Sequence, residues 1–239
     1  FFDPQTHVPR GVRFDDVIGG LARALREGET EYGLSWRLIM CFLRDRPAAE
    51  AMRMLELAMP HRDVIAGVGL DSAELGHPPQ AFAEVYETAR AAGFVAVAHA
   101  GEEGPPEYVT AALDALQVLR IDHGVAAAQD PALQRRLARA GIPLTMCPLS
   151  NLELQVTPDL SRHPLKRLLD AGLVVTVNSD DPAYLGGSLL DNYMAAQEAL
   201  GLSRADLAQL ARNSITASLL PGERQTELLA EIDRVAAEA

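Results

Sequence analysis

The sequence predicts an α/β protein built as a (β/α)8 barrel. Six short apolar runs rich in β-branched residues are each followed by a longer stretch with helical periodicity. The runs begin about 22 to 31 residues apart, which is the length of a βα unit. Polar, mostly ionisable residues follow four neighbouring runs, at the strand ends where a barrel carries its active site.

The six expected strands are continuous apolar runs without strict alternation. This pattern indicates burial on both faces, as in a parallel sheet covered by helices. The expected strands are Trp36–Leu43, Val64–Leu70, Phe94–Ala98, Arg120–Gly124, Ile142–Cys147 and Leu173–Val177.

Amphipathic helices are expected after the strands, and the pattern changes to consecutive helices after the last one. The expected helices are Phe14–Arg26, Ala48–Ala58, Pro79–Ala92, Pro106–Val118, Asp130–Ala140, Pro164–Ala171, Ser188–Leu200, Ser203–Asn213 and Gly222–Glu238. Ser203 is a typical N-cap, and Pro221 and Gly222 break the chain before the final helix. No linker or low-complexity tract divides residues 1–239, so we expect a single domain.

Composition and charge limit the classes of partner. The 239 residues are 48% hydrophobic and 23% charged, as in globular proteins. The net charge of −12 argues against nucleic acid or an anionic membrane surface, because both would repel the protein. We therefore expect a small-molecule partner, and the sequence leaves a homo-oligomer open.

The two cysteines, Cys41 and Cys147, both lie inside apolar runs and form no CxxC pair. This usage favours a reducing compartment over a disulfide scaffold. No apolar run reaches the roughly 18 residues of a membrane span. We expect a cytoplasmic protein.

The chemistry-bearing residues follow four strands. The sequence gives His99-Ala100-Gly101-Glu102, then Asp122-His123-Gly124, then Pro148-Leu149-Ser150-Asn151, and then Asn178-Ser179-Asp180-Asp181-Pro182. Two histidines and an aspartate on separate strand ends form a plausible zinc site. Taken alone, these residues also have structural explanations. His99 could be a hydrogen-bonded structural histidine, and Asp180-Asp181-Pro182 could be a turn. Glu103 could stabilise the dipole at the start of the following helix.

Other catalytic signatures are missing. The sequence contains no GxGxxG, no Walker loop, no GxSxG elbow and no HxE with PCxxC pattern. Nucleotide-phosphate binding and cytidine-type zinc deamination therefore lack a signature.

The strand-end motifs resemble the adenosine and adenine deaminase family of zinc-dependent (β/α)8 aminohydrolases. The resemblance depends on HAGE (His99–Glu102), the DHG of RIDHG (Asp122–Gly124), CPLSN (Cys147–Asn151) and NSDDPA (Asn178–Ala183), in this order. The opening FFDPQTH, GLDSAELGHPP (Gly69–Pro79) and NSDDPAYLGG are most similar to the adenine deaminase branch.

The resemblance implies a role for five residues. His99 and Asp180 are implied as ligands of one Zn2+, and Glu102 as the acid that protonates purine N1. His123 is implied to orient the attacking water and take its proton, and Asp181 to accept a hydrogen bond at purine N7. The implied reaction is hydrolytic deamination of adenine to hypoxanthine in purine salvage, or of adenosine to inosine.

Glu74 lies in a segment where adenosine deaminases carry a glycine near the purine, so it is a candidate for closing the space that ribose would fill. The alternative is a surface Glu at the start of a helix, because Glu is seldom buried unless paired.

One departure from the family matters. The family carries a His-x-His pair after its first strand, and the six histidines of this chain include no such pair. FFDPQTH resembles the tip of the second strand, which makes the six expected strands the third to the eighth. The sequence is then part of a longer protein or an incomplete barrel that is inert or serves as a binding module. A metal-dependent hydrolase acting on another cyclic amine or amide is a further alternative.

Overall fold

The computed structural model describes residues 1–238. Its internal contacts divide the chain into two compact units. The first contains Phe1–His99 and Thr110–Leu119, and the second contains Ala100–Val109 and the chain from Arg120 onward. Helix α4 (Pro106–Ala111) has residues in both sets, and the π-helical segment η5 (Ala112–Leu116) belongs to the first.

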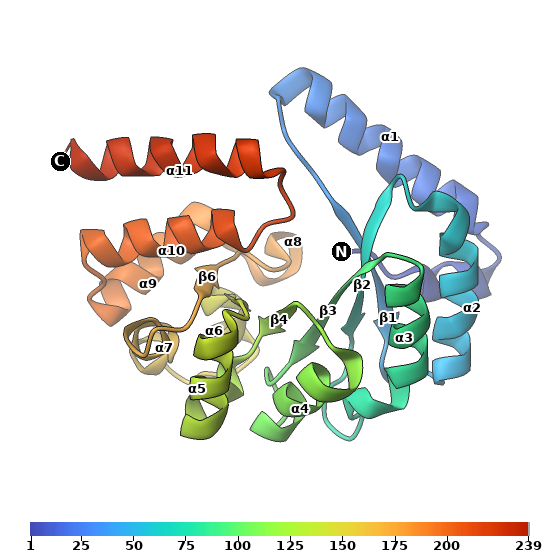
Figure 1. The fold of residues 1–239 in the computed structure, drawn as a ribbon, viewed down its shortest axis with the longest axis horizontal. Helices are drawn as coiled ribbons and strands as arrows, with labels where there is room; N and C mark the ends of the chain where they lie inside the picture. The colour runs from blue at the N-terminus through green and yellow to red at the C-terminus, as the bar shows by residue number, and fades with distance from the viewer. Residues whose placement is uncertain (239) are drawn as a thin grey trace. The chain divides into compact units, whose positions relative to one another are not determined.

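The first unit is built on three parallel strands in the order β1, β2, β3. The strands are β1 (Leu38–Leu43), β2 (Ile65–Asp71) and β3 (Val95–Ala100), and the helices are α1 (Phe14–Tyr32), α2 (Ala48–Ala58) and α3 (Ala83–Ala91). Figure 1 shows α2 and α3 beside these strands. The buried pattern of β1, in which Met40, Cys41 and Phe42 are fully inaccessible, confirms the expected burial on both faces.

Phe2 extends this sheet by one residue. Its N–H donates to the carbonyl of Ile39 and its carbonyl accepts from the N–H of Cys41, at 3.1 and 2.9 Å, which makes a parallel bridge beside β1. The chain then turns through a short 3-10 helix, Pro4–Thr6. Phe2 is buried in this bridge, whereas Phe1 is exposed.

The second unit also has three parallel strands, in the order β4, β5, β6. The strands are β4 (Arg120–His123), β5 (Leu144–Met146) and β6 (Val175–Val177). The helices are α5 (Pro131–Ala140), α6 (Pro148–Glu153), α7 (Leu165–Asp170), α8 (Pro182–Leu185), α9 (Leu189–Leu200), α10 (Arg204–Thr216) and α11 (Gly222–Ala237). In register, Ile121 pairs with Leu144 and Leu144 with Val175.

Local sequence signals set the helix starts of this unit. Asp130 accepts hydrogen bonds from the N–H groups of Ala132 and Leu133 at the start of α5. Ser188 and Ser203 each form a capping box with an aspartate three residues on, which starts α9 and α10. Figure 1 shows α10 and α11 running side by side, as their contacts require.

The α/β class and the six parallel strands are confirmed. The expected elements lie within a few residues of the observed ones, apart from short helices such as α6 and α8 that we did not predict. The prediction of one domain over residues 1–239 stays a prediction.

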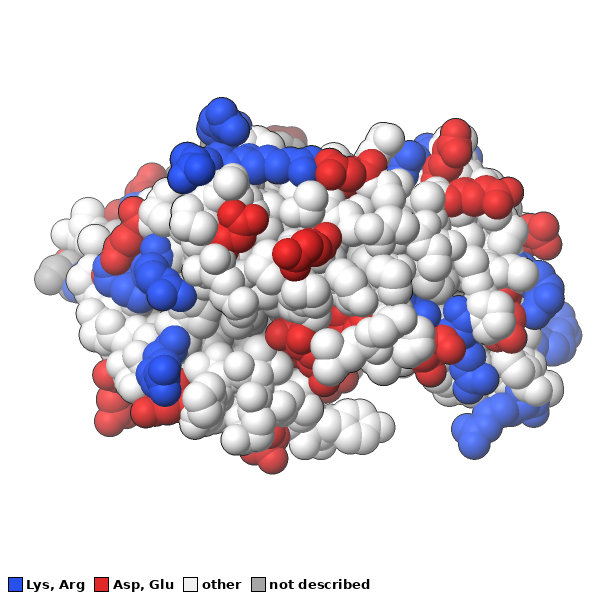
Figure 2. Space-filling view, turned by 90° about the horizontal axis from the view of Figure 1, so that it is seen from below, with Lys and Arg blue, Asp and Glu red and all other residues white. Residues whose placement is uncertain are grey.

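Among the described residues, no helix is long and apolar enough to cross a membrane. On the face drawn in Figure 2, acidic and basic side chains are interspersed.

Candidate active site

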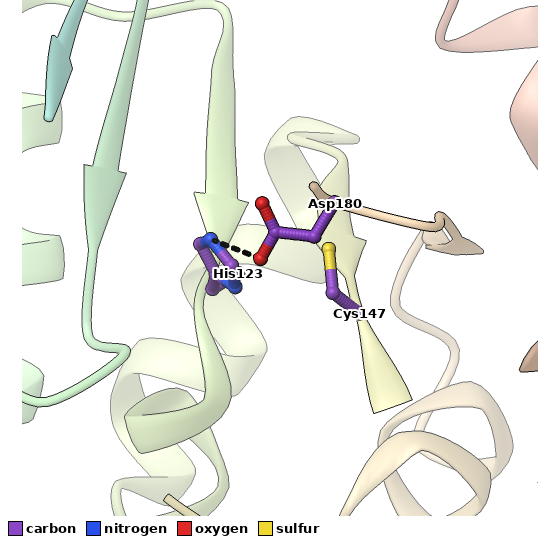
Figure 3. A group of neighbouring side chains, drawn as sticks. All are labelled: His123, Cys147 and Asp180. Atoms are coloured by element: carbon purple, nitrogen blue, oxygen red, sulfur yellow. Dashed lines mark ion pairs between the residues drawn. The ribbon is translucent and has the colours of Figure 1, made fainter. Parts of the chain in front are cut away.

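Three strand ends of the second unit bring ionisable side chains together. His123 is the last residue of β4, Cys147 directly follows β5, and Asp180 follows β6. Parallel strands end at the same edge of a sheet, so these residues meet, and one donor atom of each lies within 4.8 Å of the others. Figure 3 shows the three side chains turned toward one another.

Glu102 and His123 form the acid–base part of this group. The carboxylate oxygen Glu102 Oε1 lies 3.2 Å from His123 Nδ1. Asn151, from α6, donates through Nδ2 to the same Oε1 at 3.0 Å, and its Nδ2 lies 3.4 Å from His123 Nδ1. Only 3% of His123 is exposed, so these contacts form away from bulk water. The low local dielectric strengthens their electrostatic attraction.

Asp180 is held on the other side of the imidazole. Its Oδ2 accepts a hydrogen bond from Ser150 Oγ at 2.6 Å and lies 3.9 Å from His123 Nε2. The two nitrogens of His123 therefore face two different carboxylates. This arrangement can hold a water between an imidazole and a carboxylate and move its proton.

The backbone is strained at both of these residues. His123 has φ = 63° and Asp180 has φ = 57°, in the left-handed region that non-glycine residues rarely adopt. Such conformations cost roughly 1–3 kcal/mol each and cluster at functional sites. The strain itself supports a functional role for the two positions.

Glycine is required at two positions of the motifs, because a larger residue would clash with its neighbours and because the backbone there has a positive φ. Gly101 has φ = 71°, and a Cβ there would lie 2.6 Å from Val109 Cγ2. Gly124 has φ = 72°, and a Cβ there would lie 2.8 Å from Leu144 Cδ2. Only glycine fits the turns that present Glu102 and His123.

Asp122 has a different environment from its neighbour His123. Strand alternation directs the two side chains to opposite sides. Asp122 Oδ1 accepts hydrogen bonds from Arg120 Nε and Thr145 Oγ1, each at 2.9 Å. The ion pair with Arg120 lies within β4, and the hydrogen bond from Thr145 joins β4, the strand that carries His123, to β5.

The Asp180 carboxylate fits zinc, which takes carboxylate oxygen and imidazole nitrogen in proteins. Cys147 fits less well as a ligand. Burial raises the pKa of its thiol, and the carboxylates of Asp180, Glu102 and Asp122 raise it further. The thiolate that would bind a metal is therefore disfavoured.

Two further candidates, His99 and Glu74, belong to the first unit, and Asp181 directly follows Asp180 in the second. The ring of His99 makes an edge contact with Phe1 at 5.5 Å between centroids, and the His99 carbonyl accepts a hydrogen bond from Arg44 Nη1 at 2.8 Å. Asp181 is exposed and begins α8. Glu74 is only 3% exposed, so the surface alternative for it is wrong.

Three polar residues of the site carried no role in our sequence interpretation: Ser150, Asn151 and His163. Ser150 and Asn151 belong to the quoted CPLSN motif, but their contacts depend on α6, which we did not predict. His163 precedes Pro164 and α7 without a motif to mark it. Its burial, at 3% exposed, is visible only in the fold.

Known proteins resemble this chain over almost its whole length. The family model described as Adenosine deaminase matches residues 1–235. The adenine deaminase of Cupriavidus necator is 57% identical over 233 residues, which are 98% of this chain and 66% of that protein. This chain thus spans about two-thirds of the length of such curated relatives.

Solved structures of related proteins also match this chain over almost its whole length. The crystal structure of adenine deaminase from Arthrobacter aurescens superimposes with a TM-score of 0.96 at 44% identity, covering 99% of this chain and 72% of that one. An amidohydrolase from Burkhoderia ambifaria, crystallised with bound Zn, gives a TM-score of 0.93 at 30% identity, covering 100% of this chain and 68% of that one.

Proposed function

This chain belongs to the adenosine deaminase family, and we propose that it forms the larger part of a zinc-dependent adenine deaminase. Adenine and water are converted to hypoxanthine and ammonia, a step of purine salvage in the cytoplasm. The observation that carries the proposal is the contact of Glu102, His123 and Asp180, three residues that all belong to the second unit. The adenine deaminase relatives support the choice of substrate.

The proposed architecture is one (β/α)8 barrel domain that residues 1–239 fill in part. In this proposal the six parallel strands are the third to eighth strands, and the segment with the His-x-His pair would lie in the part of the relatives that this chain does not span. The high TM-score to an adenine deaminase over almost the whole chain supports this assignment.

His99 and Asp180 would hold the zinc, together with the His-x-His pair of the complete protein. Zinc, when bound, lowers the pKa of water to about 7, so that hydroxide is available at neutral pH. Ser150 orients the Asp180 carboxylate for this task by donating to Oδ2. Supporting hydrogen bonds of this kind fix the direction of a ligand.

Glu102 and His123 would move the protons. His123 Nε2 faces Asp180, so it is placed to take a proton from the attacking water. Glu102 would donate a proton to purine N1, which makes C6 more electrophilic. The water oxygen adds to C6, the C6 amino group receives the proton that His123 took from the water and leaves as ammonia, and hypoxanthine results.

Asp181 and Glu74 would select the base. Asp181 is proposed to accept a hydrogen bond at purine N7. Glu74, buried among the residues that follow β2, is proposed to close the space that ribose occupies in adenosine. A buried carboxylate without room for ribose would favour free adenine.

The test is a chimera in which residues 1–235 of this chain replace the matching 233 residues of the Cupriavidus necator adenine deaminase. The chimera supplies the segment that this chain does not span. We expect it to bind one zinc and to release ammonia from adenine with a higher kcat/KM than from adenosine. Ammonia release is measured on both substrates and on a panel of cyclic amines.

Each alternative predicts a different result. Preference for adenosine would make the protein an adenosine deaminase, and activity on another cyclic amine alone would change the substrate class. A folded, zinc-loaded chimera without activity on any of them would overturn the enzyme assignment. The 239-residue chain alone, assayed in parallel, reports whether the inert alternative applies to it.

A further inference from the structure

A second buried histidine lies behind the acid–base pair. His163 Nδ1 accepts a hydrogen bond from the backbone N–H of Leu165 at 3.2 Å. A backbone N–H can only donate, so Nδ1 carries no proton, and the proton of the neutral ring is on Nε2. His163 Nε2 lies 3.1 Å from Asn151 Oδ1 and therefore donates to it.

This donation decides which way the Asn151 amide points. With Oδ1 toward His163, the amide nitrogen Nδ2 faces Glu102 Oε1 at 3.0 Å. The flipped amide would place its oxygen against the Glu102 carboxylate and its N–H group against the N–H of His163. Both contacts would be repulsive, so the hydrogen-bond network permits one orientation.

We propose that His163 is a positioning residue for the deamination: its fixed tautomer orients the Asn151 amide, which in turn orients Glu102, the acceptor of the His123 Nδ1 proton. The inference rests on the proposed function for its consequence in catalysis. The hydrogen-bond chain itself is a property of the fold.

The chain of contacts assigns different roles to the two Glu102 oxygens. When His123 Nε2 is free to take a proton from water, Nδ1 is protonated and donates to Glu102 Oε1 at 3.2 Å. Oε1 then accepts from both His123 and Asn151, which uses both of its lone pairs. The acid proton destined for purine N1 is therefore carried on Oε2.

His163 suits this task because it stays neutral. Burial lowers the pKa of its imidazole to about 4, and the charge of nearby His123 contributes to the same shift. At neutral pH the ring is therefore a fixed donor at Nε2 and a fixed acceptor at Nδ1. A charged donor here would disturb the protonation of Glu102 and His123.

Three substitutions in the chimera test the inference. His163→Leu removes the donor and keeps an apolar side chain in the pocket, and we expect kcat to fall roughly 10- to 100-fold with a smaller change in KM. His163→Gln keeps an N–H at a similar reach and should recover most of the loss. His61→Gln is the matched control, because His61 pairs with Asp15 on the surface and should leave kcat unchanged.

A double substitution separates positioning from general stability. If His163 acts through Asn151, then His163→Leu should lower kcat little further in an Asn151→Ala background. Equal losses in both backgrounds, or an equal loss with His163→Gln, would overturn the inference. Zinc content and the folded fraction are measured for every variant and should not differ between the His163→Leu and His163→Gln proteins.

The tautomer is measured directly by nitrogen NMR of the histidine rings, in the 239-residue chain and in the chimera. We expect the shift of a protonated Nε2 and an unprotonated Nδ1 for His163, unchanged between about pH 8 and 6 because the ring titrates well below this range. The opposite tautomer would refute the hydrogen-bond chain even in an active enzyme. The expected tautomer in a chimera without activity would leave the chain standing and refute the proposed function.

Discussion

Among the residues that the structure describes, two groups of three side chains offer atoms that can bind a metal, one in each compact unit. In the second unit they are His123, Cys147 and Asp180. In the first unit they are Asp3, Cys41 and Asp71, with donor atoms equally within 4.8 Å of one another. The surroundings of the two groups differ, although the spacing of their atoms is alike.

The carboxylates of the second unit are met by hydrogen-bond donors, since Ser150 donates to Asp180 and Asn151 donates to Glu102. In the first unit, two carboxyl groups face each other. Burial, together with the hydrogen bond and charge of Asp3, raises the pKa of Asp71 to about 9. Asp71 therefore keeps a proton at neutral pH and is a poor ligand. Close donor atoms indicate a metal site only where neighbours stabilise their charged form.

The largest predicted difference between the two groups concerns zinc. In the chimera, Asp180→Asn should remove most of the bound zinc and lower kcat/KM by roughly a thousandfold or more, because metal-ion catalysis contributes several kcal/mol. Asp71→Asn, the matched change in the first unit, should leave zinc content within error. Zinc is measured by elemental analysis of the purified proteins. Loss of zinc from the Asp71 variant would reverse the comparison.

The next largest effect concerns the acid. Glu102→Gln keeps the hydrogen bond from Asn151 but cannot supply a proton, so we expect kcat on adenine to fall about 10²- to 10⁴-fold with zinc retained. Glu103→Gln is the control, because Glu103 is the exposed neighbour in the same loop. Steady-state kinetics on adenine decide the outcome. Similar losses in the two variants would mean that charge in this loop, and not the acid at position 102, supports the rate.

The sequence was sufficient for the fold class because local signals repeat along the chain. Uninterrupted apolar runs such as the one around Met40 predict buried parallel strands, and Ser203 marks a helix start that the structure confirms. The motifs also predicted that Glu102, His123 and Asp180 come from neighbouring strand ends, and these three do lie together.

Contacts that depend on tertiary structure were beyond prediction. Whether Glu74 is buried depends on how the chain after β2 packs, which no periodicity encodes. His163 reaches Asn151 because α6 and the turn before α7 bring them together. The left-handed backbone at His123 and Asp180 is imposed by packing, since neither residue type demands it.

A smaller predicted effect concerns the loss of stability at low pH that His163 causes in the second unit. The pKa of His163 is near 4 when folded and about 6.5 when unfolded, so the unfolded chain binds the extra proton between these values. Its contribution to stability is therefore lost as pH falls from about 6.5 to 4, by roughly 3 kcal/mol in total. The free energy of unfolding in urea should fall less steeply over this range in His163→Gln, which cannot titrate. Parallel curves for the two proteins would show that His163 is not held neutral.

The smallest predicted effect concerns Asp71 in the first unit, which lowers stability as pH rises, whereas His163 lowers it as pH falls. The raised pKa of Asp71 means that the folded state binds the extra proton between about pH 4 and 9, so this carboxyl destabilises the fold progressively as pH rises through that range. Asp71→Asn supplies an N–H that can donate to Asp3 without titrating. We expect it to raise the free energy of unfolding at about pH 8 by roughly 1–3 kcal/mol, the range for one buried polar group, and to do so less at about pH 5. A variant that is less stable at the higher pH would show that the negative charge of Asp71 is needed, and the first group would then have to be treated as a ligand site like the second.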